Sequence, residues 1–467
     1  MPGAIAGFVL TFLLWPVEAL RAQAYRVGVD PRVELISILF RLAGNDEYNQ
    51  CRVPAYDKAI EQYFAPYRNH RAVQLARGLD LGFDAPMSLA VHIADVDSLT
   101  ERVPLDRPGI KLDKRWQPAK TREFLAAARK FVSDTNFAGF LKSQQALYDE
   151  TNARLRTFVQ EKADLEWYNR FFGTRSPVRF IVVPGMANGG PSYGASFLAD
   201  DGVEEMYAIP GVWLVDATGL PQFRPEWRDT MVHEFIHSYS NPVVDKFAGQ
   251  MEKAASQMNQ PVRGAMQRQG YGDWKTLLYE SMVRATTIQY IQEHDGSEAA
   301  QRMIQQDYSR SFFWMSDLCS LLAAYQKNRP QYPTLETFMP KVVAFFNDEA
   351  SRMGELATKY EQTRPTVISM SVVDGATDVD PELAEIVVKF SRPMSTEDRN
   401  TDPRFRKGHF DATGTVLTIP VSLQADHDYQ FSLRWPNGQA FTSADGVPFQ
   451  PVSLHFRTRA AAQENKQ

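Results

Sequence analysis

The chain has 467 residues, 44% of them hydrophobic and 23% charged, and it carries a formal net charge of −5. This composition is typical of a globular protein with two or three domains and excludes an intrinsically disordered chain. The small negative charge, without a basic cluster or a phosphate-binding glycine motif, argues against nucleic acid and anionic membrane surfaces as partners.

Residues 1–24 have the features of an export signal. The apolar run at 4–15 is too short to span a bilayer, and residues 22–24 form a small-x-small cleavage site. No Lys or Arg precedes the apolar run, and a buried N-terminal helix is the alternative. We expect an exported protein (periplasmic, secreted or attached to the cell surface) whose mature chain starts near Tyr25 and has no membrane span.

The two cysteines, Cys51 and Cys319, lie far apart in the sequence. An exported protein could join them in one disulfide, but two separately buried thiols are an equally good interpretation. Neither cysteine lies in a C-x-x-C pattern, so we assign them no role in catalysis.

Residues 32–172 are predicted to be mostly helical. The segment "RVELISILFRLAG" directly follows Pro31, and "PAKTREFLAAARKFVSD" begins with Pro118; a proline suits the first turn of a helix. The helical pattern from about Thr135 to Phe172 ends at Gly173, a typical helix-ending residue.

A small sheet is predicted after these helices. The segment "VRFIVVPG" (178–185) is rich in β-branched residues and reads as a strand, and the segment "MANGGPSYGAS" reads as a loop. A second strand is predicted over 206–217, where Pro210 indicates an edge strand or a bulge. The helical pattern returns from Pro225 to about Tyr360.

Beyond residues 362–365 the pattern changes to short alternating segments separated by turn residues. These segments are "AEIVVKFS", "VLTIPV", "YQFSLRW" and "SLHFRT". Their spacing predicts a small β-sandwich, and the scattered His409, His427 and His455 are not expected to bind metal. The stretch "SMSVVDGATDVDPELAEIVVKFSRPMS" resembles the start of bacterial Ig-like domains, which serve as spacers, stalks or modules that bind cell-surface proteins or glycans.

The stretch "MVHEFIHSYSNP" (231–242) contains H-E-x-x-H on a helix predicted to begin at Pro225. His233 and His237 are one turn apart on the same helix face, so both imidazoles can reach one metal ion at about 2 Å. Glu234, next to the first histidine, is placed to take a proton from a metal-activated water. The motif predicts one Zn²⁺ per chain, with the two histidines as ligands and Glu234 as the catalytic base.

A surface helix that carries two unrelated histidines is the alternative interpretation. The neighbouring residues argue against it, because two histidines and a glutamate are costly to bury without a partner. These apolar neighbours are Met231, Val232, Phe235 and Ile236. We expect Asn241-Pro242 to stop the helix.

A catalytic zinc site needs a third protein ligand. The longer motif H-E-x-x-H-x-x-G-x-x-H is excluded, because Ser240 and Val243 occupy the positions of its glycine and last histidine. A glutamate from a later helix is the remaining common option. Glu280, in "DWKTLLYESMVRATTIQYIQEH", is our candidate, on a helix that Asp273 is predicted to cap.

Glu280 lies among apolar positions that recur with helical spacing, where a lone carboxylate needs a cation or a metal as its partner. These apolar positions are Leu277, Met282, Ala285, Ile288 and Ile291. Arg284, one turn later, is predicted to orient Glu280 without touching the metal; a simple Glu280–Arg284 ion pair is the alternative. The weaker candidates for the third ligand are Asp245, Glu252 and Glu293, in more polar surroundings.

The segment "HEFIHSYSNP", with the later "YESMVRA", resembles the gluzincin group of zinc metallopeptidases. More narrowly, it is similar to a family of exported bacterial proteins known only as a domain of unknown function. The upstream segments "PRVELISILFRLAG" and "PMSLAVHI" share this resemblance, which covers roughly residues 28–355. The resemblance implies His233, His237 and Glu280 as ligands and Glu234 as the base. The thermolysin-type N-E-x-x-D is absent around Glu280, so substrate rules are not carried over.

We therefore expect an α+β chain. A signal peptide (1–24) is followed by a mostly helical zinc metallopeptidase-like domain with a small sheet (25–362), a β-sandwich (363–460) and a frayed tail (461–467). The leading hypothesis is an exported zinc-dependent peptidase that acts on a peptide or protein substrate. The alternatives are a non-catalytic binding module with a zinc-stabilised core and a zinc hydrolase of non-peptide amides.

Two parts of the predicted active site stay open. The 206–217 strand is the natural candidate to bind an extended substrate by adding it to the sheet, although a purely structural strand is almost as good an interpretation. His92, Tyr193 and Tyr271 could each donate a hydrogen bond to the oxyanion. None of the three is preferred.

Overall fold

The structure, a computed structural model, describes residues 25–79, 81–82, 84–173, 177–396, 408–433, 441–450 and 452–460. The predicted signal peptide and the tail lie outside the described residues. The chain divides into two compact units, which are Met1–Lys246 with Asn328–Phe338, and Phe247–Lys327 with Met339–Gln467. No helix within the described part of the chain is long and apolar enough to cross a membrane.

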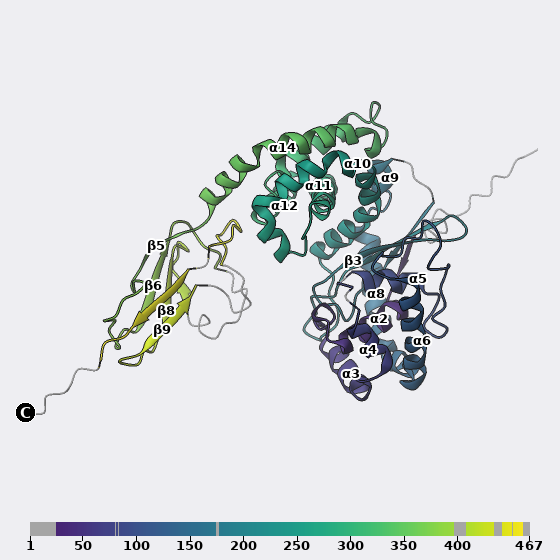
Figure 1. The fold of residues 1–467 in the computed structure, drawn as a ribbon, viewed down its shortest axis with the longest axis horizontal. Helices are drawn as coiled ribbons and strands as arrows, with labels where there is room; N and C mark the ends of the chain where they lie inside the picture. The colour runs from purple at the N-terminus through teal and green to yellow at the C-terminus, as the bar shows by residue number, and fades with distance from the viewer. Residues whose placement is uncertain are drawn as a thin grey trace, which may run out of the picture. The chain divides into compact units, whose positions relative to one another are not determined.

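The first unit is mostly helical up to the sheet, as predicted. Its helices are α2 (Pro31–Ala43), α3 (Pro54–Phe64), α4 (Arg71–Arg77), α5 (Ala85–His92), α6 (Pro118–Asp134), α7 (Phe137–Ser143), α8 (Gln145–Lys162) and α9 (Trp167–Phe172), with 3₁₀ turns η1 (Asp46–Tyr48) and η2 (Ala65–Tyr67). In Figure 1, α2, α4 and α6 pack side by side. The run predicted from about Thr135 to Phe172 is three helices, because the backbone leaves the helical conformation at Gln144 (φ −96°, ψ 0°) and at Ala163 (φ −102°, ψ 131°).

A four-stranded sheet with the order β1-β2-β4-β3 completes the first unit. Its strands are β1 (Tyr25–Val27), β2 (Val178–Val182), β3 (Tyr193–Leu198) and β4 (Glu204–Ile209). β1, β2 and β4 run parallel, and β3 is antiparallel to β4.

The strand predicted over 206–217 is present only as far as Ile209, and its predicted edge position is wrong. β4 is a central strand that ends at Ile209, directly before Pro210, because a proline has no N–H to donate to the ladder. The edge strands are β1 and β3, and β3 lies partly within the segment predicted as a loop.

Helix α10 (Pro225–Arg268) carries the H-E-x-x-H motif. The predicted stop at Asn241-Pro242 is wrong, because the helix continues through both residues. A proline inside a helix removes one backbone hydrogen bond and costs about 3 kcal/mol. The apolar residues on both sides of it, Tyr239 and Val244, are fully buried, and this packing offsets the local preference for a stop.

The second unit combines helices with the C-terminal strands. Its further helices are α11 (Trp274–Asp295), α12 (Ser297–Ser309), α13 (Met315–Lys327) and α14, which spans Leu335–Thr363. Asp273 caps α11 as predicted, because its side chain accepts from the backbone N–H groups of Lys275 and Thr276.

The C-terminal strands form two antiparallel sheets, with the orders β5-β6-β8-β7 and β10-β9. The strands are β5 (Val367–Met370), β6 (Glu385–Phe390), β7 (His409–Phe410), β8 (Val416–Pro420), β9 (Asp428–Ser432) and β10 (Ser453–Arg457). Alternate residues of β6, β8 and β10 enter one shared apolar core, which includes Val388, Leu417 and Leu454. The four segments predicted as strands are thus confirmed, and so is the α+β fold class (Figure 1).

A carboxylate is buried within the helical core of the first unit. Glu34 on α2 is fully buried and accepts a hydrogen bond from the hydroxyl of Tyr56, which in turn contacts the hydroxyl of Tyr148 at 2.8 Å. Burial raises the pKa of Glu34 to about 8, because the charged form loses its hydration, and the nearby charge of Asp30 acts in the same direction. Glu34 is therefore mostly protonated in the folded protein at neutral pH.

We expect Glu34 to make the folded protein less stable as the pH rises. The folded state keeps its proton up to about pH 8 while the unfolded chain loses it above pH 4.5, so stability is lost across this window at roughly 1.4 kcal/mol per pH unit. Glu34→Gln should remove this slope when urea unfolding is measured from pH 5 to 9. The control Glu123→Gln changes an exposed carboxylate on α6; equal slopes for Glu34→Gln and wild type would contradict the assignment.

Candidate metal centre

The two histidines of the H-E-x-x-H motif face each other on α10. Their Nε2 atoms are 3.1 Å apart, and their ring centroids are 4.8 Å apart with the ring planes at 80°. This geometry follows from the helix, because side chains four residues apart lie one above the other on one face. Both nitrogens are therefore turned toward the same point beside the helix.

Asn241 lies one further turn along α10 and contacts the second histidine. Nδ1 of His237 is 3.4 Å from Oδ1 and 3.2 Å from Nδ2 of the Asn241 amide. An amide oxygen that accepts from the Nδ1–H fixes the tautomer in which Nε2 is free to bind a metal. The sequence prediction misses this partner because Asn241-Pro242 is a helix-ending pattern, although a histidine and an asparagine four residues apart share a helix face.

The motif glutamate is held closely beneath strand β3. Glu234 is buried, and a Cβ atom added to Gly194 of β3 would lie 2.7 Å from the carbonyl oxygen of Glu234 and 3.3 Å from its Oε2. Real side chains do not approach a backbone oxygen this closely, so only a glycine lets the strand pass here. The edge strand of the sheet therefore runs directly beside the glutamate.

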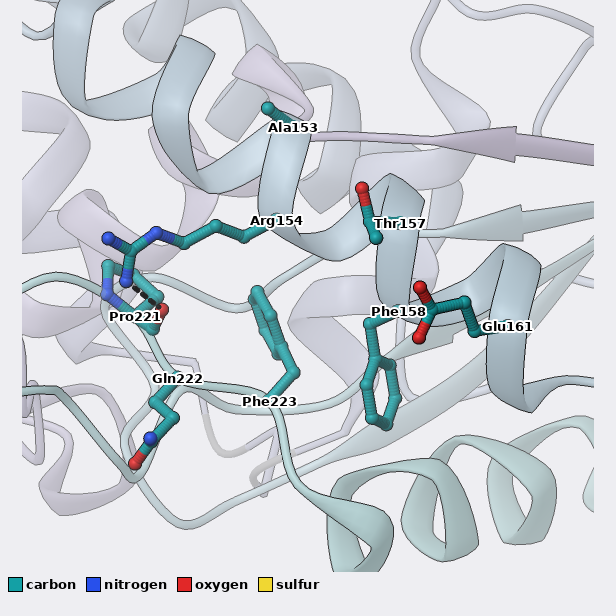
Figure 2. Close-up of a pocket in the computed structure, with 8 residues that line it drawn as sticks. All are labelled: Ala153, Arg154, Thr157, Phe158, Glu161, Pro221, Gln222 and Phe223. Carbon is teal, nitrogen blue, oxygen red and sulfur yellow. Dashed lines mark hydrogen bonds between the residues drawn. The ribbon is translucent and has the colours of Figure 1, made fainter.

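The loop that precedes α10 contacts both α8 and the first turns of α10. Arg154 of α8 forms an ion pair with Asp216 at 2.6 Å and donates to the carbonyl of Pro221 at 3.2 Å, as Figure 2 shows for Pro221. The ring of Phe223 packs edge-on against Trp227 in the first turns of α10, at 4.8 Å between centroids. The open cavity of about 510 Å³ along these residues is not lined by the motif residues. We therefore assign it no part in the metal centre.

Glu280 on α11 is held by a buried charge network in the second unit. Arg284 donates from Nε to Glu280 Oε2 at 3.2 Å, from Nη1 to Asp307 Oδ1 at 2.8 Å, and from Nη2 to the hydroxyl of Tyr271 at 2.7 Å. The guanidinium also lies 4.9 Å from the ring centroid of Phe312. The predicted Glu280–Arg284 contact is present, and it fixes one oxygen of the carboxylate.

His233, His237 and Glu280 form a group whose ligand atoms all lie within 4.8 Å of one another. Two imidazoles and a carboxylate are a usual donor set for zinc. Zn–N bonds of about 2.05 Å in a tetrahedral site place two nitrogens roughly 3.3 Å apart, close to the 3.1 Å between the two Nε2 atoms. The residues thus fit Zn²⁺, and the weaker third-ligand candidates Asp245 and Glu252, with Glu293, are not in the group.

Two of the three oxyanion candidates have other structural roles. His92 is buried and its Nδ1 contacts the carbonyl of Ser88 at 2.7 Å, and burial lowers its pKa to about 4. Tyr193 begins β3 and stacks on Tyr48. Tyr271, held by Arg284, belongs to the network around Glu280; burial raises its pKa to about 12, so its hydroxyl stays protonated.

The two cysteines are free thiols in the structure. Cys51 contacts the carbonyl of Met186 at 3.3 Å, and Cys319 is buried in α13. Of the two interpretations that the sequence left open, the structure has the separate thiols.

The fold and the His-His-Glu group define an α+β protein with a candidate site for a single metal ion. The chain belongs to the family described as "Domain of unknown function (DUF4932)", whose model matches residues 25–345. No curated protein matches the chain. Among solved structures, "Crystal structure of the S-layer protein rSbsC(31-844)" aligns at 12% identity and a TM-score of 0.17, over 73% of this chain and 42% of that one. The chain therefore spans less than half of that structure.

We expect Arg284→Met to remove the hydrogen bond that orients the Glu280 carboxylate. Two buried carboxylates, Glu280 and Asp307, would lose their cation, which destabilises a protein by about 3 kcal/mol or more. Zinc affinity should fall about 10- to 100-fold, because an outer partner orients the ligand. Thermal unfolding in chelator and zinc titration measure the two effects. Arg302→Met removes an exposed pair of the same spacing and should change little; matching losses in both variants would contradict the role of Arg284.

Proposed function

We propose that this protein is an exported zinc-dependent peptidase. The observation that carries the proposal is the H-E-x-x-H helix together with a carboxylate from a later helix, grouped within 4.8 Å. A purely structural zinc site has no use for a glutamate at the second motif position, and Glu234 occupies it beside both histidines. Export is proposed from the signal-like pattern of residues 1–24.

His233, His237 and Glu280 would hold the ion. Zinc, when bound, supplies a Lewis acid that polarises a peptide carbonyl and makes water a better nucleophile. Glu234 would accept a proton from the water as its oxygen attacks the carbonyl carbon and forms the new C–O bond. It would then donate this proton to the amine nitrogen, so that the C–N bond breaks and a neutral amine departs. Arg284 orients the Glu280 carboxylate through the contact at 3.2 Å.

Strand β3 is the proposed binding edge for an extended substrate. It is hydrogen-bonded within the sheet only to β4, and Gly194 brings it against Glu234. A peptide added to this edge would present its backbone beside the glutamate. The role that we expected of 206–217 therefore passes to 193–198.

The first test of the peptidase proposal is digestion of a diverse peptide pool by residues 25–467. Glu234→Gln should lower cleavage about 10²- to 10⁴-fold, the usual share of a general base, while bound zinc stays near one per chain. Glu226→Gln, an exposed glutamate on the same helix, should cleave like wild type. Full activity in Glu234→Gln would refute the base assignment. Zinc binding without cleavage by wild type would favour a binding module or a non-peptide amide substrate.

The second test concerns the close approach of β3 to α10. Gly194→Ala places a Cβ against the carbonyl oxygen of Glu234, so we expect the strand or the glutamate to shift and kcat to fall at least about tenfold with zinc retained. Gly249→Ala on the same helix meets no atom within 4 Å and serves as the control. Unchanged kcat in Gly194→Ala would show that the spacing between β3 and Glu234 is not needed.

A further inference from the structure

A cavity lined by several arginines lies within the second unit, apart from the His-His-Glu group. It has a volume of about 440 Å³ and is lined by the C-terminal part of α10, the end of α12, the end of α14 and Pro448. Its location involves neither His233 nor His237, and none of the proposed ligands lines it. The cavity therefore needs an explanation of its own.

Three arginines and one glutamate line the cavity: Arg268, Arg310, Arg364 and Glu361. Glu361 pairs with Arg364 at 3.2 Å, and Arg364 also donates to the carbonyl of Pro448 at 3.1 Å. Within the described parts of the chain, the guanidinium groups of Arg268 and Arg310 have no hydrogen-bond or ion-pair partner. The three cations against one anion leave the cavity with a net charge of +2.

Arg310 lies directly after α12 and is an exposed residue that lines the cavity. Its backbone is fixed, because its carbonyl accepts from Gln269 Nε2 at 3.0 Å and its N–H donates to the carbonyl of Asp307 at 3.0 Å. Desolvation by the surrounding protein, and then repulsion by the positive charge of Arg284, lower the pKa of Arg310, whereas the carboxylates of Asp307 and Glu280 act in the opposite direction. An anion in the cavity would offset this repulsion.

An aromatic pair forms one wall of the cavity. The rings of Phe313 and Tyr360 are 4.6 Å apart between centroids, and the hydroxyl of Tyr360 donates to the carbonyl of Ser309 at 3.0 Å. The wall is thus rigid and largely apolar. The volume exceeds that of a bare ion, so a ring attached to the anion could pack against these two residues.

We propose that this cavity binds a dianionic oxyanion of the phosphate or sulfate type, either free or carried as a monoester on a small ring. The net charge of +2 matches a dianion, and unpaired guanidinium forks are suited to several oxygens of one tetrahedral group. Arg268 and Arg310 are the binding residues, and Arg364, already anchored by Glu361 and Pro448, adds a third positive charge.

The test is calorimetric titration of the whole chain (25–467) with inorganic phosphate at constant ionic strength. We expect saturable binding to wild type and a loss of at least about tenfold in affinity for Arg310→Gln and for Arg268→Gln, since each loses a charged hydrogen-bond donor. Arg263→Gln changes an exposed arginine of α10 that does not line the cavity, and it should bind like wild type.

Two results would overturn the proposal. One is no saturable phosphate binding to wild type, and the other is an equal loss of affinity in Arg263→Gln, which would indicate surface charge alone. A parallel titration with glucose 6-phosphate identifies the source of the anion: tighter binding than phosphate indicates a ring-borne monoester, and equal binding indicates the free ion. The binding measurement needs no zinc and no substrate, so it is independent of the proposed peptidase function.

Discussion

Two imidazole nitrogens that face each other at 3.1 Å on a largely buried helix need a proton or a cation between them. Two lone pairs at this distance repel, and two protonated rings repel more strongly. A metal ion satisfies both nitrogens at once, and the nearby Glu280 carboxylate supplies the negative charge that a divalent ion requires. The arrangement of the residues around the histidines is understandable from this requirement.

The residues next to the proposed ligands are arranged to hold them still. Asn241 contacts the outer nitrogen of His237, and Arg284 contacts one oxygen of Glu280 while it is itself held by Asp307 and Tyr271. Buried charge networks of this kind stabilise a protein little by comparison with an apolar core. Their presence around Glu280 is better explained by the need to orient a carboxylate.

Much of this site could be predicted from local sequence. The H-E-x-x-H spacing dictates that both histidines share a helix face, and the apolar period around Glu280 marks its carboxylate as one that needs a partner. Asp273 predicts the start of α11, because a short acidic side chain before an apolar run is a strong N-cap. The C-terminal strands could be predicted because their apolar and polar residues alternate with a period of two.

Other features depend on tertiary contacts that no local pattern records. Pro242 is a strong local stop signal, yet burial of Tyr239 and Val244 on either side keeps the helix going. Pro210 correctly marks an interruption, but it marks the end of a central strand rather than an edge. β3 escaped prediction because its glycine and serine residues resemble a loop, and Gly194 is needed only because α10 lies against it.

The most direct test of the account is anomalous diffraction at the zinc edge from crystals of residues 25–467 grown with zinc. We expect one strong peak about 2 Å from the Nε2 atoms of His233 and His237 and from a carboxylate oxygen of Glu280. A peak bound by the two histidines with Glu280 still paired only to Arg284 would disprove the third ligand. A peak elsewhere in the chain would disprove the metal centre itself.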